Sequence, residues 1–321
     1  MSCILCQRST QHEYELIKCS TCLCTLCTDC VTSGNCIFCE SYNDPLDRVL
    51  EATDRIGLPN LTNSCYVNVI VQIFLHSDIL WPVFRTLFGQ HEHMLKSIRQ
   101  QYCKANNIGE TDQCDAVLFC SWIMDKIVEE NPEFKMLFSH SLQVRYVCSN
   151  DHVTDLIQTQ NIYIVYPDDN STGLTDEYDL EYDQDMTQCI AQQSKDTVEK
   201  LCVQCNRVCL HDYLFGIYDL TFNLFFNLQQ FEDKSVYIYE TITLFLPAKN
   251  QAMEYTLKGF VVHKGTNRAG HYVIYIREND NTWSLYNDRK ITLVEDIDIV
   301  LKIKKQGETI PLLWYVADSD Y

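Results

Sequence analysis

The sequence lacks any segment that would carry the chain into or across a membrane. Residues 1–6 have neither the basic start nor the apolar run of a secretory signal peptide. No uncharged apolar stretch approaches the roughly 20 residues that span a bilayer. We therefore expect an intracellular protein, in the cytoplasm, the nucleus or both, with no membrane partner.

Basic side chains are scarce. The chain has 25 Lys and Arg against 44 Asp and Glu, a formal net charge of −19. Binding to nucleic acid needs clustered Lys and Arg to neutralise phosphates, so this balance argues against a nucleic-acid partner. The acidic excess fits either a basic partner or plain solubility.

Apolar residues, in contrast, are plentiful. Of the 321 residues, 46% are hydrophobic and 12% aromatic, which excludes a disordered chain. This length is enough for one large domain and one small domain.

Cysteine is the most informative residue type. An intracellular chain with 18 cysteines is expected to use them for metal binding or catalysis before disulfides. Half of them crowd into the N-terminus, at Cys3, Cys6, Cys19, Cys22, Cys24, Cys27, Cys30, Cys36 and Cys39. The C-x2-C spacing lets two thiolates bind one tetrahedral zinc, and so short a segment needs metal to fold. We expect residues 1–42 to form a zinc module.

One register of these cysteines resembles a RING finger. The resemblance implies two zinc ions, one held by Cys3, Cys6, Cys27 and Cys30, the other by Cys22, Cys24, Cys36 and Cys39. Pairing of Cys19 with Cys22 is a competing register. RING fingers commonly recruit a ubiquitin-conjugating enzyme, and Ile4 suits that role. The last knuckle has no proline and no arginine follows it, so an interaction module without ligase activity is the alternative.

A polar turn then leads into an apolar run with one cysteine at the junction. Residues 43–53 read as a linker, and residues 67–75 are apolar on nearly all sides, which predicts a buried central helix. Its β-branched residues leave a strand as the alternative, but Asn63 or Ser64 is placed to cap a helix. Cys65 would then lie at the helix N-terminus, where the dipole and free N–H groups favour the reactive thiolate.

The stretch GLPNLTNSCYVN at residues 57–68, with Gln72 beyond it, resembles the cysteine box of the ubiquitin-specific protease family, G-L-x-N-L-G-N-T-C-Y-M-N-S-x-L-Q. The resemblance implies that Cys65 is the nucleophile and that Asn60 helps form the oxyanion hole. Such a donor typically contributes ~3 kcal/mol to transition-state stabilisation. Thr62 replaces the glycine of this box, a departure within the turn.

The C-terminal third resembles the histidine boxes of the same family. FVVHKG at 260–265, AGHYVIYI at 269–276 and WSLYND at 283–288 follow its V-V-H-x-G, G-H-Y and W-x-x-F-N/D-D boxes. The resemblance implies that His271 is the general base, that Asn287 orients its imidazole and that Asp288 assists. We expect His263 to be structural.

The middle of the chain matches the family less completely. QCDAVLF at 113–119 resembles the Q-Q-D-A-x-E-F box, with Leu118 in place of glutamate, and we interpret it as structural support beside the cleft. The family holds a zinc between two C-x2-C knuckles in its fingers. One knuckle is intact here and the other keeps one cysteine, with Asp151 at the second position. The candidate ligands are Cys148, His152, Cys202 and Cys205, a workable Cys3His set, and fingers without metal are the alternative.

The resemblance covers roughly residues 54–318. It implies an α+β fold, a papain-like catalytic domain of thumb, palm and fingers, preceded by the RING-like module and the linker. The implied function is a cysteine-type deubiquitinase that cuts after the C-terminal glycine of ubiquitin, with ubiquitin or ubiquitinated proteins as partners. One alternative is a silent ubiquitin-binding scaffold, suggested by Thr62, Leu118 and Asp151. Another is a RING-type ligase with an editing protease domain.

Overall fold

The computed structural model describes most of the chain beyond residue 54. The continuous stretches are 55–89, 93–166, 196–228, 236–246, 250–266, 269–295 and 308–318, and shorter pieces lie at 16–18, 25–27, 31–32, 35–36, 174–175, 181–182, 184–186, 190 and 297. The chain divides into two compact units, Met1–Leu50 with Gln90–Glu92 and Glu51–Gly89 with His93–Tyr321. Among the described residues, no helix is long and apolar enough to cross a membrane.

The first unit contains two short antiparallel hairpins. Strand β1 (Leu16–Lys18) pairs with β2 (Thr25–Cys27), and β3 (Val31–Thr32) pairs with β4 (Asn35–Cys36). Of the predicted zinc ligands here, Cys3, Cys6, Cys22, Cys24, Cys30 and Cys39 lie outside the described residues, as do the linker at 43–53 and the unassigned Cys19. Only the backbone is described at Cys27 and Cys36.

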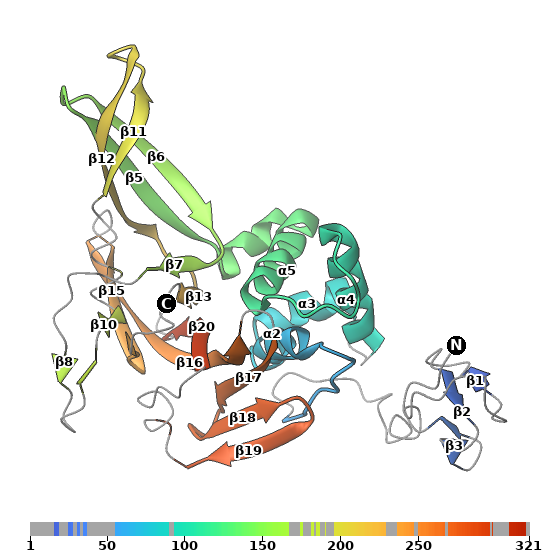
Figure 1. Cartoon of the computed structure of the whole chain (residues 1–321). Helices are drawn as coiled ribbons and strands as arrows, with labels where there is room; N and C mark the ends of the chain where they lie inside the picture. The colour runs from blue at the N-terminus through green and yellow to red at the C-terminus, as the bar shows by residue number, and fades with distance from the viewer. Residues whose placement is uncertain are drawn as a thin grey trace. The chain divides into compact units, whose positions relative to one another are not determined.

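The second unit begins with a group of helices (Figure 1). They are α2 (Cys65–Leu75), α3 (Leu80–Phe88), α4 (His93–Asn106), α5 (Ala116–Glu130) and the 3-10 helix η2 (Pro132–Leu137). The α5 helix starts where the Asp115 carboxylate accepts hydrogen bonds from the N–H groups of Val117 and Leu118.

Helix α2 lies at the centre of this group, and all eleven of its residues are buried. It packs against α3, α4, α5 and the strand β17. Tyr66 meets Phe119 of α5 edge-on, with ring centroids 5.3 Å apart. The predicted buried helix is confirmed over the strand alternative, because burial on every side stabilises even β-branched residues in a helix.

The eight-stranded palm sheet has the order β19-β18-β17-β16-β20-β13-β7, with β15 also pairing with β16. Its strands are β7 (Tyr163–Val165), β13 (Asn223–Leu228), β15 (Thr241–Leu246), β16 (Gln251–Thr266), β17 (Ala269–Arg277), β18 (Trp283–Asn287), β19 (Lys290–Val294) and β20 (Glu308–Ala317). All pairs are antiparallel except β13 with β7.

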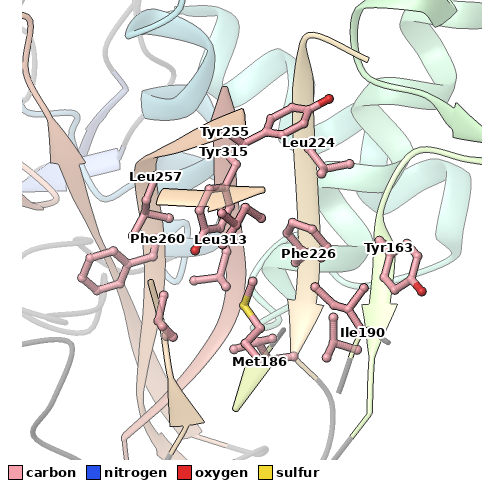
Figure 2. Close-up of a cluster of buried hydrophobic side chains, with 14 of the residues drawn as sticks. Tyr163, Met186, Ile190, Leu224, Phe226, Tyr255, Leu257, Phe260, Leu313 and Tyr315 are labelled. Carbon is pink, nitrogen blue, oxygen red and sulfur yellow. The ribbon is translucent and has the colours of Figure 1, made fainter. Parts of the chain in front are cut away.

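A hydrophobic cluster lies against this sheet. Figure 2 shows Phe226 of β13 and Leu313 and Tyr315 of β20 among its members. Strand β13 is buried along its whole length, and the Trp314 indole N–H donates to the Asn223 side chain at 3.0 Å. This core holds β16 and β20 in place, and β16 in turn carries β17, the strand of His271.

A second, four-stranded sheet extends away from the palm sheet (Figure 1). We call it the fingers sheet. Its antiparallel strands have the order β11 (Asp196–Cys202), β12 (Arg207–Asp219), β5 (His140–Cys148) and β6 (Val153–Gln160). Two tight turns, at 149–152 and 203–206, form its tip. The short strands β8 (Leu174–Thr175), β9 (Glu181–Tyr182), β10 (Gln184–Asp185) and β14 (Val236–Tyr237) form two further pairs. Helices and largely antiparallel sheets make this unit α+β, as predicted.

Candidate active site

Cys65 is the first residue of α2, and its side chain is buried. The predicted cap is wrong in its mechanism. Ser64 is the N-cap residue but makes no side-chain cap, because its Oγ accepts from the Leu61 N–H at 2.7 Å instead. Asn63 points its amide to the Thr111 carbonyl at 2.9 Å. No side chain therefore caps the first turn of α2, where the N–H groups of Val67 and Asn68 donate to the Ser64 carbonyl.

The turn before Cys65 has a left-handed backbone. Thr62 has φ 63° and Asn63 φ 54°. Asparagine tolerates this region, but a β-branched threonine does so at a cost. This explains why the family has glycine at the position of Thr62. The guanidinium of Arg99, buried on α4, donates to the Leu61 carbonyl and holds the turn in place.

His271 lies on β17, beside the start of α2. Its Nε2 lies 2.7 Å from Asn287 Oδ1, which fixes Nε2–H as the donor and leaves Nδ1 for the thiol. Contact with the Cys65 side chain, followed by the bond to Asn287, raises the pKa of His271 to about 9 against the opposing effect of burial. An imidazole that stays protonated at neutral pH favours a thiolate beside it.

Asp288 connects the cysteine box to the histidine boxes. Its carboxylate accepts from Asn60 Nδ2 at 2.9 Å and from Asn68 Nδ2 at 2.8 Å. Its backbone carbonyl accepts from the Leu58 N–H at 3.0 Å, and its Oδ2 lies 3.8 Å from His271 Nε2. Sequence reasoning missed Asn68, whose match to the cysteine box was the available signal. One N–H of Asn60 is therefore used by Asp288, which leaves its second N–H for an oxyanion.

Two glycines allow close backbone approach around the site. A Cβ on Gly57 would lie 2.2 Å from the Arg289 carbonyl oxygen, and one on Gly270 would lie 2.1 Å from His263 Nε2. Only glycine fits at either position. His263 is buried, packs against Tyr272 with ring centroids 4.4 Å apart and the rings tilted by 38°, and has its pKa lowered by burial. Its contacts are those of a packing residue.

Gln113 holds the residue before His271. Its Nε2 donates to the Gly270 carbonyl at 2.6 Å, and its Oε1 accepts from the Gly270 N–H at 3.1 Å. Both polar groups of that backbone unit are thus fixed by one side chain from another part of the chain. The sequence placed this box beside the cleft without assigning Gln113 a partner.

A buried polar chain anchors the strand that carries Asn287. The Tyr286 hydroxyl donates to Glu278 Oε1 at 2.8 Å and lies 2.8 Å from Nε2 of His76, which follows α2. Arg55 lies 3.5 Å from Glu278 Oε2. Burial lowers the pKa of His76. These polar contacts connect the C-terminal end of α2 to β18, and no sequence motif predicted them.

The structure brings all four predicted ligands of the fingers together. The Cys148 and Cys205 sulfurs are 3.8 Å apart, and His152 Nδ1 lies 3.2 Å from Cys205 Sγ and 3.6 Å from Cys202 Sγ. Sulfurs bound to one tetrahedral zinc are about 3.8 Å apart, and a nitrogen and a sulfur about 3.5 Å apart. The donor set fits zinc. The N–H of Cys205 contributes most to lowering the pKa of Cys202 to about 6.

Comparison with known proteins identifies the family. The family model described as ubiquitin carboxyl-terminal hydrolase matches residues 92–313, more than half of the chain, and the chain belongs to this family. The match begins after Cys65. The match therefore includes His271 and Asn287 but not Cys65, the predicted nucleophile.

The relatives place the chain within that family at a distance. It is 36% identical over 61 residues to ubiquitin carboxyl-terminal hydrolase 14 of Caenorhabditis elegans, a match that spans 18% of this chain and 12% of that relative. Two solved structures of the SAGA DUB module, Ubp8/Sgf11/Sus1/Sgf73, one bound to monoubiquitin and one to ubiquitin aldehyde, share the fold. Each covers 95% of this chain and 79% of the other, at 17% identity and TM-scores of 0.65 and 0.66.

Proposed function

We propose that this chain is a cysteine deubiquitinase that hydrolyses the bond after the C-terminal glycine of ubiquitin. One observation carries the proposal most directly. A buried cysteine at a helix N-terminus, a histidine of raised pKa and an asparagine within 2.7 Å of that histidine meet at one point. Membership of the ubiquitin carboxyl-terminal hydrolase family and a fold shared with ubiquitin-bound structures support the substrate.

In the first half of the reaction, the Cys65 thiolate attacks the carbonyl carbon of the substrate glycine, while His271 keeps the proton. The free N–H of Asn60 and the first N–H groups of α2 stabilise the oxyanion. When the tetrahedral intermediate collapses, His271 gives its proton to the leaving amine and a thioester remains on Cys65.

In the second half, His271 acts as the base. It takes a proton from a water molecule, and the resulting hydroxide attacks the thioester carbon. Collapse of the second tetrahedral intermediate releases the ubiquitin carboxylate and restores the thiolate–imidazolium pair. Asn287 keeps the imidazole in the required orientation throughout, and Asp288 holds Asn60 in place.

The fingers zinc has a structural role in this proposal. Cys148, His152, Cys202 and Cys205 would hold it, and its bonds would join the two turns at the tip of the fingers sheet. The metal would add to the backbone hydrogen bonds of this tip, where the Cys148 N–H donates to the His152 carbonyl and the Val203 side chain is exposed.

The proposal extends to the N-terminal block and to the location of the protein. Its cysteine spacing supports a RING-like module with two zinc ions and a surface for a ubiquitin-conjugating enzyme. The abundance of cysteine supports a reducing compartment, the cytoplasm or nucleus. Auto-ubiquitination with a conjugating enzyme, lost in Cys3→Ser, tests the module. If zinc binds but no ubiquitin is transferred, the block is an interaction module.

The decisive test of the activity is labelling by ubiquitin that carries a C-terminal electrophile. We expect the wild type to form a covalent adduct and Cys65→Ala to form none. Cys114→Ser, a buried cysteine outside the triad, is the matched control and should be labelled. Binding of ubiquitin by folded wild type without labelling or turnover would contradict the proposal and identify a silent scaffold.

A further inference from the structure

The fingers sheet carries a second set of metal-ligating side chains one step below the tip. Ligand atoms of Cys148, Cys202, Cys209 and His211 all lie within 4.8 Å of one another. The ligand atoms of the first set, Cys148, His152, Cys202 and Cys205, also lie within 4.8 Å of one another. The two sets share two cysteines and differ in the other two residues.

The strand register explains this arrangement. His211 of β12 is directly opposite Cys148 of β5, and Arg207 is opposite Cys202 of β11. Because side chains alternate along a strand, Cys209 and His211 lie on the same face of the sheet as those two cysteines. Cys148 and Cys202 belong to both sets. They have His152 and Cys205 on the side of the tip and Cys209 and His211 on the other side.

His211 is also prepared as a ligand. It is buried, and its Nδ1 lies 3.0 Å from the Cys209 backbone carbonyl. A carbonyl only accepts, so Nδ1 carries the hydrogen and Nε2 keeps its lone pair. Metal-bound histidines almost always donate their other N–H to a carbonyl or carboxylate in this way.

We propose that the fingers hold two zinc ions bridged by the Cys148 and Cys202 thiolates. His152 and Cys205 complete the coordination of the first ion, and Cys209 and His211 that of the second. Each ion then has four ligands. Four thiolates and two neutral imidazoles balance two divalent ions, whereas one ion on the first set leaves a net negative charge. The two zinc ions would stabilise the tip, because the opposite face of the sheet is exposed there and does not do so.

This inference rests on the proposed function, which places one zinc ion in the fingers. The zinc content per full-length chain distinguishes one ion from two. Differences from wild type cancel any zinc in the N-terminal block. We expect Cys209→Ser and His211→Gln each to lose one zinc and Cys148→Ser to lose two. Val208→Ala is the matched control and should lose none, because Val208 neighbours Cys209 on the opposite, exposed face.

Two outcomes overturn the second ion. If Cys209→Ser and His211→Gln keep all zinc while Cys148→Ser loses one, the fingers hold a single ion. If Cys148→Ser also keeps all zinc, the fingers zinc itself is wrong, while the catalytic proposal is untouched. X-ray absorption of the wild type guards against misfolded variants. It should show a zinc–zinc distance on the order of 3.5 Å, and its absence contradicts the bridge.

Discussion

The catalytic centre and the fingers tip are both built from cysteine and histidine, but they are held together differently. Cys65 and His271 sit on a helix and a strand that are far apart in the chain, and backbone and amide contacts fix them. At the tip, Cys148 and Cys202 end two strands, β5 and β11, that lie on either side of β12, and side-chain contacts bring them together with His152 and Cys205. The first site is ordered by the fold, whereas the second would be ordered by metal. Substitutions at the candidate active site should therefore affect the reaction without affecting the fingers, and changes at the fingers tip should affect the structure there without affecting the reaction.

The largest separation should come from His271→Ala. Without the base, we expect kcat on a fluorogenic ubiquitin substrate to fall by roughly 10⁴-fold. The melting temperature and zinc content should stay close to wild type, because this side chain is one-third exposed. Activity within tenfold of wild type would remove His271 from the reaction.

Removing Gln113 should affect the same centre less. We expect Gln113→Leu to lower kcat by roughly 10- to 100-fold, since the Gly270 backbone loses both fixed bonds and His271 is displaced. Gln100→Leu is the matched control, because Gln100 binds only the exposed Glu110 side chain among described residues. Equal kcat in both variants would mean that Gln113 is only a packing residue.

Loss of metal from the fingers should change binding rather than chemistry. We expect chelation or Cys148→Ser to raise KM by roughly tenfold, about 1.4 kcal/mol of ubiquitin binding, with kcat less affected. A large fall in kcat at unchanged KM would show that the two regions are coupled, and would end the separation drawn above.

The pH profile should report the histidine directly. The raised pKa means that the imidazolium is present below about 9 and is lost as pH rises through that value. Activity should therefore decline above pH about 9, since the leaving amine loses its proton donor. Asn287→Ala removes one contribution to the raised pKa, so its decline should begin at lower pH. A decline at the same pH would assign the titration to another group.

The smallest effect concerns the turn. Thr62→Gly should raise the free energy of unfolding by roughly 1 kcal/mol, because glycine adopts φ 63° without strain. Thr86→Gly, in the exposed part of α3, should lower it by a similar amount. Urea denaturation of both variants measures the difference. A destabilised Thr62→Gly would mean that threonine is suited to this turn.

How much of the site could be predicted from the sequence depended on how far apart in the chain the interacting residues lie. Cys65, His271 and Asn287 could be proposed as catalytic residues because each lies in a short motif, and the helix at Cys65 was predicted from its apolar run. The cap was wrong because Ser64 turned to Leu61, a choice that depends on the turn's left-handed backbone. Asn68 was given no role although it matches the cysteine box, and Gln113 was given no partner, since Asp288 and Gly270 are distant from them in the chain.

The fingers sheet shows the same limit of prediction from sequence. Cys202 and Cys205 were read from their spacing, and His152 from its place beside an incomplete knuckle. Cys209 and His211 were missed, because their alternation looks like any strand until β12 is aligned with β5. Pairing register is a tertiary property, and two residues become candidate ligands only once it is known.

The position of β20 determines when the palm sheet can be completed during synthesis. This strand, Glu308–Ala317, lies between β16 and β13 in the middle of the palm sheet, yet it is synthesised after both. Until then, β16 and β13 each have one edge without its partner strand, and β16 is the strand that supports β17 and His271. Long-range pairing of this kind is slow and comes late. A nascent chain on the ribosome therefore carries Cys65 early, but the palm sheet that supports His271 is complete only after residue 317 has emerged.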